Sequence, residues 1–148
     1  MKYLCLVLFC LLLLAGCSQV VSQPQAATII IGSTIIQVEV ADNDATHYQG
    51  LSDRSSLANN HGMLFVFDRA DNYGFVMRRM SFSLDIIWLN NNKIVDIKNN
   101  LPPDNDDYPL VYYPIAPANT VLEVPAGTAK NNNWQIGQAV IINYALAK

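Results

Sequence analysis

The sequence predicts a mainly β (α+β) domain, a compact sandwich or partly closed barrel with one or two short helices. Its apolar runs are short and rich in β-branched residues, and Gly, Asn or Pro interrupts them at close spacing. This pattern favours strands over helices. Residues 28–148 suit a single domain with a modest core, and the sequence contains no internal repeat.

The first two strands are expected to form a hairpin. Thr28–Ile31 and Thr34–Val40 are separated only by Gly32-Ser33, and glycine in a two-residue loop permits the positive φ of a tight hairpin turn. Polar and apolar residues alternate along the second strand, so one of its faces is wet and the other buried. Further strands are expected at Met63–Phe67, Tyr73–Met77, Leu84–Leu89, Lys93–Ile97, Thr120–Val124 and Ala139–Tyr144.

Helices and long loops occupy the remaining segments. Asp44 is suited to cap a short helix over Ala45–Leu51, and Thr128–Trp134 is expected to form one helical turn. Asn99–Pro117 holds five of the seven prolines and is expected to be a long surface loop. Its three tyrosines either form a contact surface for a partner or fold back over an open end of the β domain.

The amino-terminal leader has the organisation of a signal peptide. Lys2 precedes an uncharged apolar run that ends in the small pair Ala15-Gly16. About fourteen helical residues would cover roughly 21 Å, which is short of the ~30 Å hydrocarbon core of a bilayer. The sequence therefore favours a cleaved leader over a membrane-spanning helix.

Leu-Ala-Gly-Cys at the end of this leader resembles the lipobox of bacterial lipoproteins. The resemblance implies cleavage before Cys17 and attachment of palmitate-like acyl chains, which hold a protein durably on a membrane. We expect residues 1–16 to be a signal peptide and residues 17–27 a lipidated cysteine with a flexible tether. Ser18 after the lipid site implies, by the same resemblance, a periplasm-facing position on the outer membrane.

Composition excludes several classes of function. Cys5 and Cys10 leave with the leader and lipid consumes Cys17, so no thiol remains for a disulfide, a metal or catalysis. The net charge is −3, and no basic cluster exists beyond Arg78-Arg79, so nucleic acid is not an expected partner. No nucleophile elbow, phosphate loop or metal-binding spacing is present, so we expect no metal and no cofactor.

Blocks across nearly the whole mature domain resemble a prokaryotic family, domain of unknown function 192. The GMLFVF and LE-x-PAG blocks are specific together. The resemblance implies a compact, mainly β domain that is often exported, with no assigned reaction. The residues that carry it are Gly50-Leu51, Arg54, Leu57, Gly62–Phe67, Leu84–Ile87 and Leu122–Gly127.

The chain departs from the family pattern in two blocks where a pocket is most expected. The usual Arg-x-x-Gly-Leu-Met reads His47–Ser52 here, and the usual Trp-Met-Lys-Asn-Thr reads Val76–Met80. Met77 is unchanged in the second block, and Arg78 keeps the cationic charge. A ligand that relatives hold with the tryptophan, asparagine and threonine would therefore be lost or altered in this chain.

Asp85 is the most unusual polar residue, because alternation gives its strand two apolar faces. Such a carboxylate needs a partner, either an arginine such as Arg54 or Arg78 or a set of backbone N–H groups. Glu123 also lies among apolar strand residues, where it is a solvated residue, a partner for the following Ala126-Gly127 turn, or part of a hydrolytic pair with Asp85. A structural role is favoured for both acids.

Six residues are the candidates for a ligand site, and none is assigned a catalytic role: Arg54, His61, Met77, Arg78, Asp85 and Glu123. The leading hypothesis is a non-enzymatic binding or accessory module that acts on a small polar ligand or on an envelope protein. A hydrolase that uses the carboxylates, His61 and Arg54 is the first alternative, and a purely structural envelope protein is the second.

Overall fold

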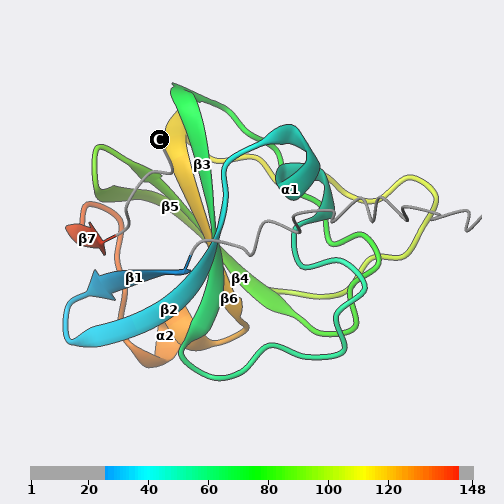
Figure 1. Ribbon diagram of the computed structural model, residues 1–148, viewed down its shortest axis with the longest axis horizontal. Coiled ribbons are helices and arrows are strands. Elements are labelled where there is room, and N and C mark those ends of the chain that lie inside the picture. Colours follow the sequence, from blue (N-terminus) through cyan, green and yellow to red (C-terminus); the bar gives the residue numbers. More distant parts are fainter. Residues whose placement is uncertain (1–25, 144–148) are drawn as a thin grey trace, which may run out of the picture.

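The computed structural model describes residues 26–143, which form one curled sheet of seven strands with two short helices (Figure 1). This confirms the predicted mainly β fold. The leader, Cys17 and the tether up to residue 25 lie outside the described residues. The strand order is β5-β4-β6-β3-β2-β1-β7. The elements are β1 (Ala26–Ile31), β2 (Thr34–Ala41), α1 (Asp44–Gln49), β3 (His61–Asp71), β4 (Leu84–Asn90), β5 (Lys93–Leu101), β6 (Ala118–Pro125), α2 (Thr128–Asn131) and β7 (Val140–Asn143).

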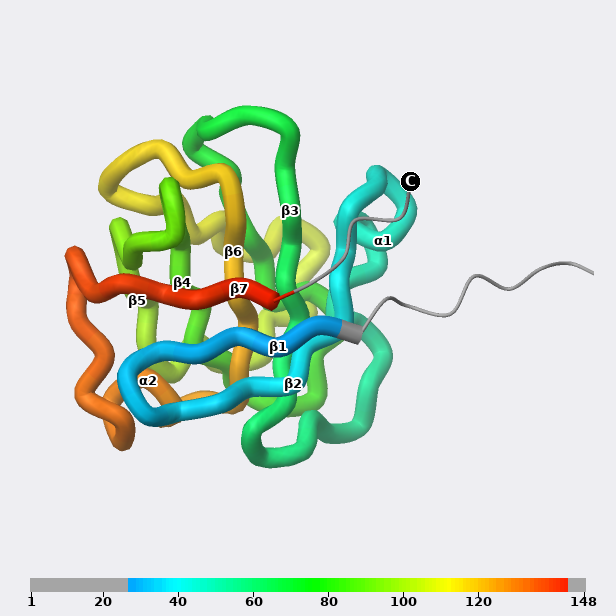
Figure 2. The backbone as a smooth tube through the Cα atoms, turned by 60° about the vertical axis from the view of Figure 1, so that its left-hand side comes forward, coloured from blue at the N-terminus to red at the C-terminus, as the bar shows by residue number. Residues whose placement is uncertain are grey.

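The sheet curls until its two edges meet at one end. Gly137 N donates to the carbonyl oxygen of Ile94 at 2.8 Å, and Ile94 N donates to that of Gln138 at 3.0 Å. These bonds join the start of β5 to the segment that leads into β7. Figure 2 shows β1 and β7 lying across β4 and β6. Of the two predicted architectures, the described chain adopts the partly closed barrel.

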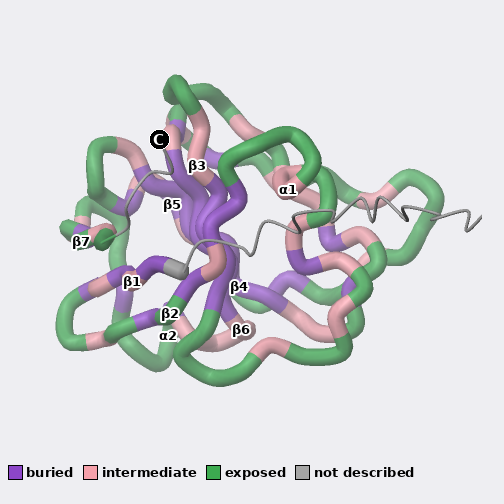
Figure 3. Tube along the Cα trace, viewed as in Figure 1, coloured by how far each residue is buried: buried purple, intermediate pink, exposed green. Residues whose placement is uncertain are grey.

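The buried residues are concentrated in the central strands (Figure 3). They form two apolar cores, one on each face of the sheet. The inner core joins residues of β1, β2, β4 and β6 across the curl, together with Trp134 and Val140 near the closing end. The outer core lies on the opposite face, where Phe65, Trp88 and Val121 meet Leu51 and Met77 from the covering loops. Because side chains alternate along a strand, neighbouring residues of β4 and β6 belong to different cores.

A crossover connection places α1 over the outer face. β2 and β3 are parallel neighbours, with Glu39 opposite Met63, whereas the other strand pairs of the sheet are antiparallel. Parallel neighbours cannot be joined by a tight turn, so residues 42–60 leave the sheet and cross it. Gly62 admits the start of β3, because a Cβ there would lie 2.5 Å from the carbonyl oxygen of Glu123.

Several element boundaries differ from those expected. Asn43 caps α1, because its side chain accepts from Thr46 N and the Thr46 hydroxyl accepts from Asn43 N; Asp44 is the first helical residue instead. β1 begins at Ala26, within the range assigned to the tether, because its first residues pair with β2. The loop predicted over 99–117 starts after Leu101, since β5 runs to that residue.

The predicted strand Tyr73–Met77 is not part of the sheet. Its only ladder pairing is a bridge, in which Phe75 and Tyr112 exchange two backbone hydrogen bonds of 2.8 and 2.9 Å. The neighbouring positions in the sheet are already filled, because β3 and β6 pair with each other and with β2 and β4. The segment therefore crosses the outer face as an extended strap.

Candidate ligand-binding site

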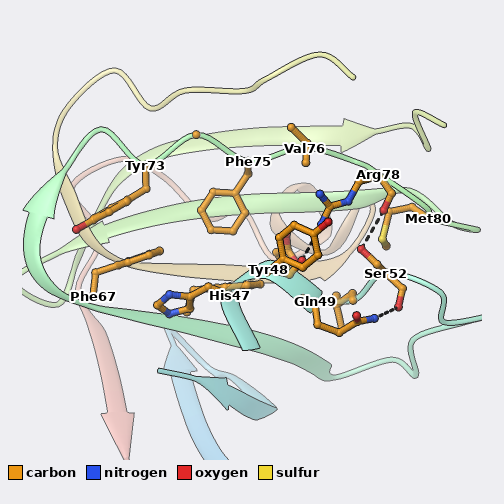
Figure 4. Close-up of a pocket in the computed structure, with 15 residues that line it drawn as sticks. His47, Tyr48, Gln49, Ser52, Phe67, Tyr73, Phe75, Val76, Arg78 and Met80 are labelled. Atoms are coloured by element: carbon orange, nitrogen blue, oxygen red, sulfur yellow. Dashed lines mark hydrogen bonds between the residues drawn. The ribbon is translucent and has the colours of Figure 1, made fainter. Parts of the chain in front are cut away.

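The strap, α1 and the outer face of the sheet enclose a cavity of about 270 Å³ (Figure 4). This volume lies just below the usual range for ligand pockets, so the cavity suits a small molecule. Both blocks in which the chain departs from the family pattern contribute to the lining. The lining residues are His47, Tyr48, Gln49, Gly50, Leu51, Ser52, Phe65, Phe67, Tyr73, Gly74, Phe75, Val76, Arg78, Met80 and Glu123.

Aromatic rings form the walls of this cavity. Phe67 and Tyr73 stack with a centroid separation of 3.6 Å and close one end, where His47 packs 4.5 Å from Phe67 (Figure 4). Phe65 and Phe75 meet edge to face at 4.9 Å. Paired rings from α1, β3 and the strap therefore hold one another in place, and the wall they present is flat and apolar.

Hydrogen bonds fasten Arg78 and Arg79, the two residues that follow the strap, to the loop after α1. The Ser52 hydroxyl donates to the carbonyl oxygen of Arg78 at 3.0 Å, and Asp53 N donates to that of Arg79 at 2.9 Å. The Arg79 side chain returns to the Asp53 carboxylate at 2.9 Å. Asp53 and Arg79 both have positive φ, of 66° and 52°, so the two tight bends face each other and fix the width of the cavity at this end.

Arg78 lies at the rim of the cavity. Its guanidinium sits 4.2 Å from the centroid of the Tyr48 ring, and Nη2 donates to the Tyr48 carbonyl oxygen at 2.7 Å. Its Nε is buried and has no hydrogen-bond partner in the described structure. Arg78 thus provides fixed positive charge beside the opening, held against an aromatic ring.

Glu123 forms part of the inner wall of the cavity. It pairs with Met63 of β3 and Ile86 of β4 in the ladder, so its side chain points to the outer face with them. The residue is only 5 % exposed, and its carboxyl group makes no hydrogen bond or ion pair within residues 26–143. Burial raises the pKa of Glu123 to about 8, although the positive charge of Arg54 acts in the opposite direction.

Arg54 and His61 lie beside the cavity in an adjacent hollow. Arg54 makes a two-pronged ion pair with Glu39, with N–O distances of 2.5 and 2.8 Å, and this hydrogen bonding lowers the pKa of the Glu39 carboxyl. His61 is exposed, and its Nδ1 lies 3.1 Å from the carbonyl oxygen of Asn59. Both residues line the hollow together with Glu39 and Leu57. Of the six candidates, only Arg78 and Glu123 line the main cavity.

Asp85 is a structural residue in the inner core. Its carboxylate accepts hydrogen bonds from Asn100 N at 2.8 Å, Gly127 N at 3.0 Å and Ala129 N at 2.9 Å. Of the two kinds of partner predicted for Asp85, the structure therefore has the backbone N–H groups and not an arginine. Asp85, and not Glu123, satisfies the turn at Gly127 and anchors α2 and the end of β5 to the sheet.

Met77 is fully buried in the outer core and does not line the cavity. Met77 and Asp85 therefore do not join Arg78 at this site. Its carboxyl group comes instead from Glu123, because Asp85 lies opposite Val124 and shares the other face of the sheet.

This register also removes the proposed hydrolytic carboxylate pair. Ile86 lies opposite Glu123, and Asp85 lies opposite Val124, so the two acids point to opposite faces. Residues 26–143 contain no group of three His, Cys, Asp or Glu side chains placed to hold a metal ion. In the same part of the chain, no helix is long and apolar enough to cross a membrane.

The aromatic wall was not anticipated from the sequence. Phe67, Tyr73 and Phe75 fall in runs that read as ordinary strand residues, and only the crossover brings them under α1. The departures from the family pattern at His47–Ser52 and Val76–Met80 were the one signal that pointed to this region.

Comparisons with known proteins agree with the fold. The model of DUF192, described as an uncharacterised ACR, matches residues 27–142. The chain belongs to the DUF192 family. A comparison with curated proteins finds no match.

Two solved structures resemble this DUF192 domain. One is a protein from Sinorhizobium meliloti 1021 that is described provisionally as a transcription regulator. It has a TM-score of 0.69 and 26% identity, and the match covers 80% of this chain and 93% of that one. The other is a protein of unknown function from Novosphingobium aromaticivorans DSM 12444, with a TM-score of 0.67 and 28% identity over 78% of this chain and 83% of that one.

Proposed function

We propose that this DUF192 domain is a non-enzymatic module that binds a small ligand in the cavity between α1, the strap and the sheet. The observation that carries the proposal is the Glu123 carboxyl group, which is buried in the cavity wall without a hydrogen-bond partner in the described chain. Because Glu123 lines the cavity, a bound ligand can supply the partner that its carboxyl group lacks. The two carboxylates that the hydrolase alternative would use, Asp85 and Glu123, point to opposite faces of the sheet.

The leader and Cys17 support a location for this module. We propose that the leader is cleaved before Cys17 and that acyl chains on Cys17 hold the domain at a bacterial envelope membrane, facing the periplasm. Labelled palmitate is expected to enter the wild-type protein and not the Cys17→Ser variant, whereas incorporation into neither would contradict the anchor.

The binding test uses the mature protein purified in detergent. Val76→Trp is expected to fill part of the cavity, and Ile35→Trp, on an exposed position of β2, serves as the matched control. Native mass spectrometry and thermal shifts with a small-molecule panel should reveal a ligand for the wild type and the control, with binding weakened at least tenfold in Val76→Trp. Equal binding by all three proteins, or none by any, would contradict the proposal.

A protein contact is a second candidate, because the loop from Pro102 to Pro117 exposes large apolar side chains. Tyr108 is 94% exposed and Ile115 is 70% exposed, and apolar surface of this kind is typical of contact sites. Tyr112 instead packs against the outer core, so the loop both covers the domain and presents a surface. Crosslinking from a photoreactive residue at position 108 in intact cells would identify such a partner, and an uncrosslinked protein would count against it.

A further inference from the structure

The polar groups of the cavity restrict the chemistry of its ligand, and the following inference rests on the proposed binding function. Most polar side chains in the lining already have partners. His47 Nε2 lies 3.0 Å from the carbonyl oxygen of Ala41, Ser52 donates to Arg78, and the Tyr73 hydroxyl donates to the carbonyl oxygen of Arg69 at 3.1 Å. Two buried groups of the described lining keep no hydrogen-bond partner: Nε of Arg78, at the rim, and the carboxyl group of Glu123, which forms part of the inner wall.

We infer that the ligand is a flat, neutral cyclic amide, whose adjacent N–H and C=O groups both meet the carboxyl group of Glu123. A protonated carboxyl group has one O–H donor beside one carbonyl acceptor. A cyclic amide presents the complementary pair in the same plane, so two parallel hydrogen bonds form. The flat aromatic walls of the cavity then stack against the ring of the ligand.

The charges around Glu123 favour a neutral ligand over a cationic one. Arg54 approaches from the loop after α1, where Glu39 of β2 neutralises it, and Arg78 lies at the rim on the strap. The titratable groups of α1 in the lining are His47 and Tyr48, and Tyr73 lies at the far end. The adjacent residues of β3 and β4, Met63 and Ile86, carry no charge. When Glu123 is protonated, an organic cation in the cavity would therefore meet the positive charges of Arg54 and Arg78 and no free carboxylate.

The raised pKa of Glu123, about 8, agrees with this geometry. Near pH 7 the carboxyl group is mostly protonated and offers both hydrogen bonds. At pH 9 only about a tenth of the sites keep the proton, so the apparent Kd should rise about tenfold for a neutral ligand.

The test uses 2-quinolone as the ligand and N-methyl-2-quinolone, which lacks the N–H donor, as its matched control. Calorimetry at pH 7 on the mature protein should show 2-quinolone binding at least tenfold more tightly than the methylated compound. Glu123→Gln keeps a donor and an acceptor, so it should retain binding and lose the change between pH 7 and pH 9. Glu123→Leu should weaken binding at least tenfold, and circular dichroism establishes that each variant is folded.

Other outcomes would overturn the inference. Benzylammonium binding that strengthens as the pH rises, and that Glu123→Gln abolishes, would show that the ionised carboxylate recognises a cation. A different outcome would refute the cyclic amide and leave the binding function intact. In it, 2-quinolone does not bind, but another small molecule binds to the wild type and binds more weakly to Val76→Trp. The proposed function itself fails if the protein binds none of the compounds in the wider panel, or if Val76→Trp binds them as well as the wild type does.

Discussion

Asp85 and Glu123 are two buried carboxyl groups on neighbouring strands, yet their surroundings are opposite. Asp85 is 0% exposed and accepts three backbone hydrogen bonds from α2, its preceding turn and β5. Glu123 is 5% exposed and has no such partner in the described chain. Burial alone therefore does not identify a binding site. The hydrogen bonds that a buried group lacks are more informative.

Asp85→Ala should have the largest effect on stability. The change leaves three buried N–H groups without an acceptor, so we expect the free energy of unfolding to fall by about 4 kcal/mol. Chemical denaturation at pH 7 measures the loss. Asp85→Asn keeps one acceptor oxygen and should lose less. A loss below 1 kcal/mol for the alanine variant would mean that the three hydrogen bonds do not stabilise α2 and its turn as described.

The second largest effect is expected in the pH dependence of the free energy of unfolding, to which Glu123 contributes. Its folded-state pKa of about 8 lies above the ordinary value of 4.5 for a glutamate, so between these values the folded protein holds a proton that the unfolded chain has released. The stabilisation is complete below the unfolded value and is lost as the pH rises towards 8. The slope from this group is at most about 1.4 kcal/mol per pH unit.

Glu123→Gln should remove that slope, because the amide does not titrate. The measurement is the free energy of unfolding at pH 5, 6, 7 and 8 for the wild type and the variant. We expect the free energy of unfolding of the wild type to fall relative to that of the variant as the pH rises. Parallel curves for the two proteins would show that the Glu123 carboxyl group is not held in its protonated form.

Arg54→Met should have the smallest effect on stability. About a third of each side chain in the Arg54–Glu39 pair is exposed, so solvent screens the pair and we expect a loss of about 0.5 kcal/mol. The variant also tests the surroundings of Glu123, because the positive charge of Arg54 lowers the pKa of Glu123. Carboxyl NMR titration should show the Glu123 pKa moving upward in Arg54→Met, and a downward movement would contradict the geometry.

Alternation along single strands was predictable, but contacts across the crossover were not. The sequence correctly separates Asp85, Ile87 and Leu89 from Leu84, Ile86 and Trp88. It does not reveal that Asp85 is opposite Val124, because strand pairing depends on the three-dimensional register. This register decides which acid faces the cavity.

The aromatic wall could not be predicted for a related reason. Phe67 and Tyr73 are near in sequence, but His47 and Tyr48 reach them only because β2 and β3 are parallel and the connection between them crosses the outer face. Short polar segments such as residues 42–60 give no sign of the direction in which they leave a sheet. Arg54 and His61 were therefore grouped with Arg78 and Glu123, although they line a neighbouring hollow.

The position of β1 has a mechanical consequence. This first described strand is held between β2 and β7, with six residue pairs on one side and four on the other. Backbone hydrogen bonds run across the strands, so a pull along the chain at Ala26 loads both ladders in shear. Many bonds must then fail together, so the amino end of the domain can bear tension from the proposed anchor without unravelling the domain.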